Sequence, residues 1–135
     1  MDARLLKKSY FNKFIVELSK KNKIIAPVKK DILRFSEVND PEQISFSGHP
    51  LFSAKKYFKK PKQTVFSYDK AGIKEEINNE EFILFGIRLC DINALLKLDK
   101  LFLDEFDDKE YKLSRESITL IGINCETAPK DTCFC

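Results

Sequence analysis

The 135-residue sequence lacks long apolar runs and any recognisable targeting segment. No run of 18 or more apolar residues is present, so the sequence predicts no transmembrane helix. The opening residues, MDARLLKKSY, have neither the apolar core nor the small-residue cleavage site of a secretory signal peptide. We therefore expect a cytoplasmic protein without a membrane contact, in a compartment where thiols stay reduced.

Glycine is scarce, and its four residues are isolated from one another: Gly48, Gly72, Gly86 and Gly122. The chain thus has no Gly-rich loop of the kind that cradles phosphates. Gly86 and Gly122 interrupt apolar runs, where close packing of neighbouring side chains accounts for them.

Histidine occurs once, as His49, in a polar stretch over residues 39–50. Nothing near it has the spacing of metal ligands, and no local signature pairs it with a cysteine nucleophile. A lone histidine in a polar loop is usually just exposed, so we predict no functional role for it. The acidic run 104–110 is more typical of a solvated turn than of paired catalytic carboxylates. We expect no self-contained catalyst.

The composition is that of a globular protein, with 43% hydrophobic and 33% charged residues. This length suits one hydrophobic core, so we predict a single α/β domain over residues 1–135. Charge is uneven: residues 1–62 carry 15 Lys or Arg against 6 Asp or Glu, and residues 63–135 carry 9 against 15. Such asymmetry indicates either a docking face or merely a Lys-rich solvated surface.

Lysines alternate with aromatic residues over residues 55–62, as in some proteins that bind single-stranded nucleic acid. The segment is short and belongs to no nucleic-acid motif, so we predict no nucleic-acid partner. We favour an amphipathic helical turn with Tyr57 and Phe58 packed inward.

In the first half of the chain, hydrophobic periodicity predicts an amphipathic helix over residues 3–22. Two short strands follow, 24–28 and 32–38, and Pro27 favours a position at the sheet edge for the first of them. The remaining elements expected here are a short helix capped by Ser53 and ended by Pro61, and a strand over residues 64–68.

The second half contains two continuous apolar runs, 82–87 and 118–123, which are typical of buried strands. Between them we predict a helix from an N-cap at Asp91 to about residue 102, and a shorter helix over 109–115. Strand, helix, helix and strand form a parallel, right-handed crossover. The fold class expected is therefore α/β: a small mixed sheet with a parallel β-α-α-β crossover in the C-terminal half and an N-terminal amphipathic helix.

All four cysteines lie in the last third of the chain: Cys90, Cys125, Cys133 and Cys135. The first two directly follow the predicted parallel strands, whose carboxyl ends share one sheet edge, and the last two could fold back over it. Cys90 would lie near a helix N-terminus, with Arg88 two residues before it, and both features favour a thiolate. The topology thus predicts that four thiols converge there, with Arg88 and Asp91 as supporting residues.

Four thiolates suit an iron–sulfur cluster or a tetrahedral zinc ion. No Cys-x-x-Cys motif is present, and we expect Cys133 and Cys135 to bind one centre only if their loop bends. On spacing alone, buried small apolar cysteines with an oxidisable Cys-Phe-Cys tail remain an open alternative. A thiol redox enzyme with a low-pKa cysteine is a third one.

A resemblance to a known family rests on two motifs: Gly-Ile-Arg-Leu-Cys-Asp at residues 86–91 and Cys-Phe-Cys at 133–135. With Tyr111, Arg115 and the Ile-Gly-Ile-Asn-Cys run at 121–125, they resemble the N-terminal part of the beta subunit of cytosolic sulfhydrogenase-type nickel–iron hydrogenases. The A subunit of anaerobic sulfite reductase and other 4Fe-4S dicluster proteins share this pattern. Leu89 stands where members often have proline.

The resemblance implies an iron–sulfur electron-transfer subunit that docks a flavin- and nicotinamide-binding subunit and a catalytic subunit. In that family, ferredoxin-type motifs in a C-terminal region hold the relay clusters, and this sequence has no such motif. We therefore expect the chain to be the N-terminal module of a longer electron-transfer subunit, cut or truncated at Cys135. The alternative is a non-catalytic docking scaffold with a structural zinc ion or no metal.

Overall fold

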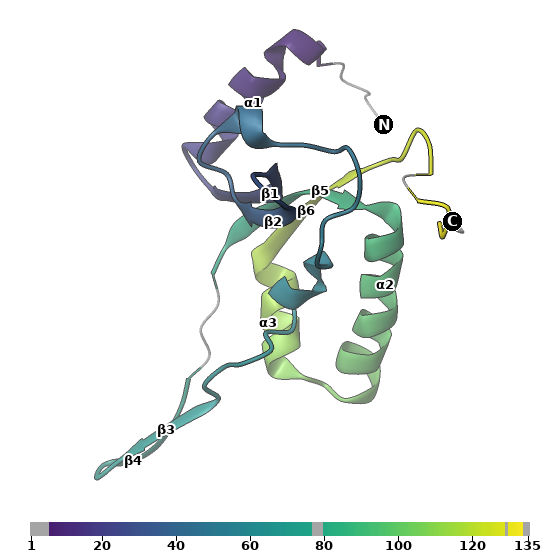
Figure 1. The fold of residues 1–135 in the computed structure, drawn as a ribbon. Coiled ribbons are helices and arrows are strands. Elements are labelled where there is room, and N and C mark those ends of the chain that lie inside the picture. Colours follow the sequence, from purple (N-terminus) through teal and green to yellow (C-terminus); the bar gives the residue numbers. More distant parts are fainter. Residues whose placement is uncertain (1–5, 77–79, 129, 134–135) are drawn as a thin grey trace.

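The most apolar segments of the chain form a four-stranded mixed sheet. The computed structural model describes residues 6–76, 80–128 and 130–133. The sheet has the order β2 (Leu33–Glu37), β1 (Lys23–Lys29), β5 (Phe82–Arg88) and β6 (Ile118–Ile123) (Figure 1). β1 pairs antiparallel with β2 and parallel with β5, and β5 pairs parallel with β6. This confirms the predicted mixed sheet and the parallel pairing across the crossover.

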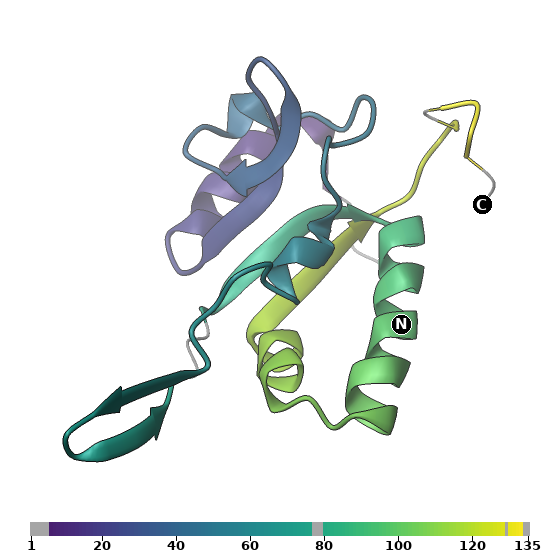
Figure 2. The same cartoon turned by 60° about the horizontal axis from the view of Figure 1, so that its bottom comes forward.

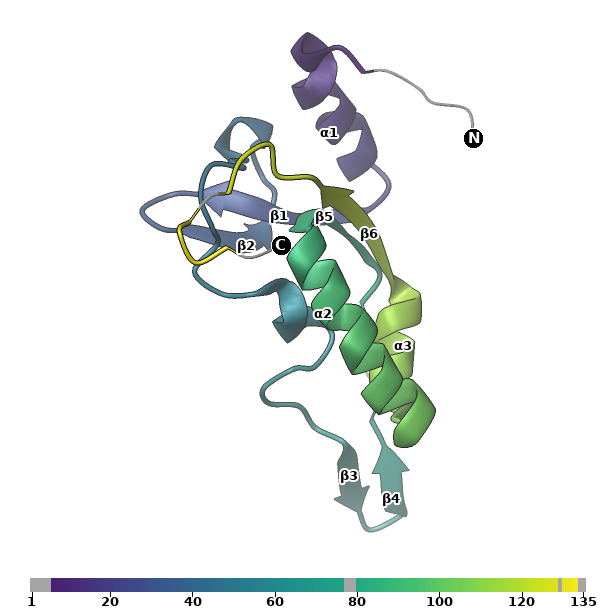
Figure 3. The ribbon, with the colours of Figure 1, turned by 90° about the vertical axis from the view of Figure 1, so that its right-hand side faces the viewer.

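Helices cover both faces of the sheet. α1 (Phe11–Ser19), preceded by the short 3₁₀ helix η1 (Lys8–Tyr10), lies on one face. α2 (Leu89–Asp99) and α3 (Lys109–Ser117) lie on the other, together with the 3₁₀ helix η3 (Ala54–Tyr57) (Figures 1 and 3). The remaining short helix is η2 (Pro41–Gln43).

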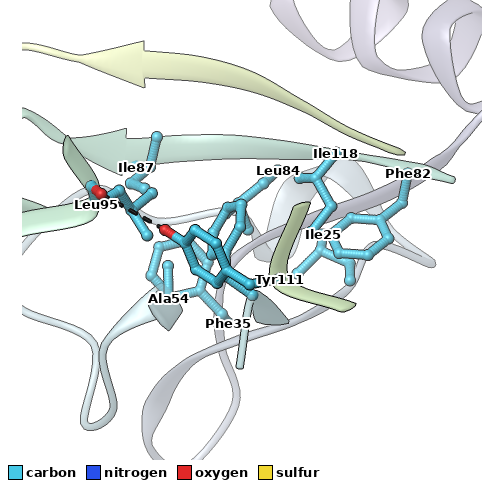
Figure 4. Close-up of a cluster of buried hydrophobic side chains, with 10 residues drawn as sticks. Ile25, Phe35, Ala54, Phe82, Leu84, Ile87, Leu95, Tyr111 and Ile118 are labelled. Atoms are coloured by element: carbon cyan, nitrogen blue, oxygen red, sulfur yellow. Dashed lines mark hydrogen bonds between the residues drawn. The ribbon is translucent and has the colours of Figure 1, made fainter. Parts of the chain in front are cut away.

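β5 supplies side chains to both cores, since all seven of its residues are buried. On the α2–α3 face, Phe82, Leu84 and Ile87 pack with Leu95 and Tyr111 in a cluster shown in Figure 4. On the α1 face, a second cluster contains Ile15, Ile24, Ala26, Ile83 and Phe85. The continuous apolar run of β5 is therefore the pattern of a strand buried on both sides.

The helix bounds differ from those predicted. The N-terminal helix is shorter than expected, and α2 passes at Lys100 into a π-helical segment, η4 (Lys100–Glu105). Asp91 is not the N-cap of α2: Arg88 occupies that position, and Asp91 lies in the first turn, where it accepts a hydrogen bond from Ser53 Oγ at 2.7 Å. Ser53 caps η3 as predicted, by accepting a hydrogen bond from the backbone N–H of Lys55.

Pro27 does not mark a sheet edge, because β1 lies between β2 and β5. The parallel ladder with β5 stops at Ile25, and beyond it the backbone N–H of Ser45 donates to the carbonyl of Pro27. Since the ladder to β5 has ended, the missing N–H of proline removes none of its hydrogen bonds. This is the physical reason why the edge prediction was wrong.

β5 bulges at Gly86. Phe85 pairs with Ile121 and Ile87 with Gly122, so Gly86 is an extra residue on β5, with a φ of +78°. A Cβ at Gly86 would lie 2.7 Å from the Phe46 ring and 3.0 Å from Pro27 Cδ. Only glycine combines this left-handed backbone with so close an approach of neighbouring side chains.

A hairpin projects away from the sheet and its helices (Figure 2). Its strands, β3 (Phe66–Asp69) and β4 (Gly72–Glu75), form a separate antiparallel pair. β3 overlaps the predicted strand 64–68, whereas β4 was not predicted from the sequence.

Asp99 joins α2 to α3. Its carboxylate accepts hydrogen bonds from the hydroxyl of Tyr111 at 2.6 Å and from two nitrogens of Arg115 at 2.7 and 2.8 Å. The Arg115 hydrogen bond is the main reason why the pKa of Asp99 lies below its usual value.

Among the described residues, no helix is long and apolar enough to span a bilayer.

The bulge gives a stability prediction. Gly86→Ala should lower the free energy of unfolding by about 2–4 kcal/mol, because it adds both backbone strain and overlap with Phe46 and Pro27. Gly48→Ala is a matched control, since Gly48 has a φ of +79° but no atom within 4 Å of the added Cβ. It should cost only the backbone term, about 1 kcal/mol. Urea denaturation measures both; equal losses would contradict the packing role of Gly86.

Candidate functional site

The candidate site lies where β5 and β6 end side by side. Arg88 is the last residue of β5, and although charged it is only 6% exposed. Its Nη1 donates to Cys125 Sγ at 2.7 Å, and its Nη2 donates to the carbonyl oxygens of Phe46, at 2.9 Å, and Gly48. One guanidinium thus fastens the segment after β6 and the loop before η3 to the end of β5.

Cys90 is the second residue of α2 and is exposed. Its position in the first turn places it near the backbone N–H groups and the positive end of the helix dipole, as predicted. Both features stabilise a negatively charged sulfur.

His49 lies beside Cys133, with 3.7 Å between Nε2 and Sγ. The prediction of an isolated, simply exposed histidine was therefore wrong: the imidazole is half-buried next to a thiol. The pKa of His49 is lowered mainly by burial and further by the positive charges of Arg88 and Lys130, which favours the neutral ring. No spacing in the sequence predicts this pair, because 84 residues separate its members and the Arg88 hydrogen bonds to the adjacent loop bring them together.

The described thiols divide between two neighbouring hollows. His49, Cys90 and Cys133 line one of about 590 Å³, together with Asn93, Lys97 and Lys130. Cys125 lines the other, of about 490 Å³, beside Arg88 and the Phe46–Gly48 backbone. The structure thus brings Cys90 and Cys133 into one pocket and sets Cys125 in the next, against the guanidinium.

The thiol and imidazole groups of this edge are of the kinds that bind metals, but they are not arranged as a complete metal site. Thiolates and a neutral imidazole are good ligands for zinc and iron. However, across residues 6–76, 80–128 and 130–133, no three His, Cys, Asp or Glu side chains form a group that could hold a metal ion. Cys135, the fourth predicted ligand, lies outside the described residues. The described residues alone therefore do not form a complete metal site.

The protein has an α/β fold in which Arg88, Cys90 and Cys125 lie at the carboxyl ends of two parallel strands. Proteins of the α/β class usually bind their ligands at this edge of the sheet. In sequence, the chain is 31% identical over 132 residues to sulfhydrogenase 2 subunit beta of Pyrococcus furiosus. That match covers 96% of this chain and 39% of the length of the relative. No protein-family model and no solved structure matches the chain.

The chain is thus a relative of a hydrogenase beta subunit, which confirms the resemblance drawn from the Gly-Ile-Arg-Leu-Cys-Asp and Cys-Phe-Cys motifs. It spans well under half of that protein, so the activity of the whole relative does not carry over to it directly.

Arg88 should be the residue on which the geometry of this edge depends most. Arg88→Lys removes the planar fork that reaches three acceptors, so it should lower the free energy of unfolding by about 1–3 kcal/mol. Amide hydrogen exchange over residues 46–49 should also become faster. Arg34→Lys, at an exposed arginine, should change stability by less than about 0.5 kcal/mol. An unchanged exchange rate in Arg88→Lys would show that other contacts hold the loop.

Proposed function

We propose that the chain is the N-terminal module of an electron-transfer subunit in a redox complex of the hydrogenase or sulfite reductase type. The observation that carries this proposal is the similarity to a sulfhydrogenase beta subunit over nearly the whole chain. The gathering of thiols at the β5–β6 edge supports it, because cofactors of α/β proteins bind at the carboxyl ends of parallel strands.

The cofactor proposed is an iron–sulfur cluster held by Cys90, Cys125, Cys133 and Cys135. When bound, such a cluster supplies a one-electron carrier. The residues of the chain would provide the ligands and stabilise their charge. Cys90 lies in the first turn of α2, at the positive end of the helix dipole, and the Arg88 guanidinium donates to Cys125. Three of these thiols line the two adjoining hollows, and the cluster would require them to meet.

On this proposal the chain transfers electrons or docks partners and does not catalyse alone. Substrate chemistry would belong to a flavin- and nicotinamide-binding subunit and a catalytic subunit. The reduced state of the thiols suits a cytoplasmic complex.

A docking role without electron transfer is the second candidate, and the β3–β4 hairpin favours it. Tyr68 and Ile73 face each other across the hairpin and are 88% and 78% exposed, with Phe66 on the same face at 60%. Since a lone two-stranded hairpin is only marginally stable in water, such an apolar face gains stability when a partner covers it. We propose another subunit of the redox complex as that partner, with zinc or no metal at the thiols.

Metal analysis tests the electron-transfer proposal. After anaerobic reconstitution, the wild-type protein should contain iron and acid-labile sulfide and absorb in the visible range, and Cys90→Ser should lose this absorbance. Asn93→Ala is the matched control, because it changes a side chain of the same pocket without removing a thiol. Unchanged absorbance in Cys90→Ser would remove Cys90 from the ligand set. Zinc alone, or no metal, would favour the docking scaffold.

The hairpin supplies a test of docking. Tyr68→Ser with Ile73→Ser should weaken binding to the purified flavin subunit or catalytic subunit at least about tenfold, because exposed aromatic and aliphatic anchors dominate such interfaces. Lys74→Ser, on the opposite face of the hairpin, is the control. Both variants should leave the free energy of unfolding nearly unchanged, since these side chains are exposed. Equal affinities in a binding titration would contradict the docking role of the apolar face.

A further inference from the structure

His49 is the one described imidazole in the chain, and its position is fixed rather than incidental. The carbonyl of Gly48, the residue before it, accepts a hydrogen bond from buried Arg88, as does that of Phe46. On the other side of the pocket, the backbone N–H of Cys133 donates to the carbonyl of Lys130 at 3.0 Å, which closes a turn. Two separate backbone restraints thus hold the imidazole and the thiol opposite each other.

The separation of the two donor atoms has a specific meaning in coordination chemistry. In a tetrahedral site, metal–sulfur and metal–nitrogen bonds of about 2.3 and 2.0–2.1 Å place two ligand atoms about 3.6 Å apart. His49 Nε2 and Cys133 Sγ are 3.7 Å apart. Without metal this separation is that of a hydrogen bond between the thiol and the imidazole, and it already matches the spacing of two ligands on one ion. The four thiolates of a [4Fe–4S] cluster, by contrast, bind four different irons and lie farther apart.

We propose that His49 and Cys133 are ligands of one tetrahedral transition-metal ion, with Cys90 as the next ligand. Cys90 lines the same pocket, whereas Cys125 lies in the neighbouring hollow against Arg88. The structure holds the pair at ligand spacing, and binding of the ion completes the set by recruiting the Cys90 thiol. This inference rests on the part of the proposed function in which Cys90 and Cys133 bind metal, and it puts His49 in the place of Cys125 among the ligands.

The ion has two possible sources with the same ligand types. The first is zinc bound by all three side chains, and the second is a [2Fe–2S] cluster in which His49 and Cys133 bind one iron and Cys90 binds the other. Metal and acid-labile sulfide analysis of the protein as purified anaerobically separates them. Zinc near one per chain without sulfide identifies the first, and iron with sulfide identifies the second.

Co²⁺ titration of the reduced, metal-free chain tests the ligand assignment. The wild-type chain should bind one Co²⁺, with a thiolate charge-transfer band and the intense visible bands of tetrahedral Co²⁺. His49→Ala should weaken Co²⁺ binding at least about tenfold and change the visible bands, because even residues that merely support ligands contribute 10–100-fold to affinity. Cys133→Ser and Cys90→Ser should both lower the charge-transfer intensity, and Cys125→Ser should not.

Two further substitutions distinguish a ligand from a hydrogen-bond donor. His49→Cys supplies a new metal-binding thiolate and should retain tight Co²⁺ binding. His49→Gln keeps an N–H near the position of Nε2 but is a poor ligand, so it should behave like His49→Ala. Far-UV circular dichroism of each variant establishes that it is folded.

The outcomes separate this inference from the proposed function. If wild type and His49→Ala bind Co²⁺ with equal affinity and identical spectra, His49 is not a ligand. That result would not argue against the cluster bound by cysteines in the proposed function. If zinc without iron depends on His49, the electron-transfer proposal fails and the His49 site stands. A wild-type chain that binds neither Co²⁺, zinc nor iron overturns both.

Discussion

The arrangement of the whole protein depends on the burial of β5 on both of its faces. Every residue of this strand is buried, so apolar side chains must be covered by α1 on one side and by α2, α3 and η3 on the other. Burial of this kind is the main favourable free-energy change in folding. It also requires β1 and β6 as neighbours, since the backbone polar groups of a buried strand need ladder partners. The position of two thiols results from this arrangement, because Cys90 and Cys125 each lie two residues after the end of one of the parallel strands.

At the end of β5, one buried charge organises the surrounding loops. The bulge at Gly86 shifts the register before Ile87 and Arg88. The guanidinium is compensated by three acceptors: a sulfur and two backbone carbonyls. Because an uncompensated buried charge is strongly unfavourable, losing any of these acceptors would destabilise the protein. The hydrogen bonds of Arg88 therefore fix the position of Cys125 and of the loop that carries His49.

Two surfaces of different character result from this fold. The β5–β6 edge is built from hydrogen-bonded, partly buried groups, which suits the precise placement of a metal or cofactor. The β3–β4 hairpin is extended, exposed and apolar on one face, which suits contact with another protein. The relative identified by sequence is itself named as a subunit.

By itself, the sequence determined the parallel strands β5 and β6, the helices between them, the β1–β2 pair and the position of Cys90 near a helix N-terminus. These features depend on local periodicity and on apolar runs, which a single sequence displays directly. The N-cap of α2 and the place of Pro27 were wrong, because tertiary contacts override local preference there, and the strand β4 was missed. Ser53 donates a hydrogen bond to Asp91, and the ladder between β1 and β5 ends before Pro27 while β1 stays paired with β2.

Only the tertiary structure decided how the candidate ligands group. His49 and Cys133 are 84 residues apart in the chain, and no periodicity links them. Their proximity results from a guanidinium that binds the carbonyl next to His49 and from a turn that positions Cys133. Such contacts depend on the summed geometry of several elements rather than on spacing, which is why the sequence indicated the edge of the sheet but not the neighbours within it.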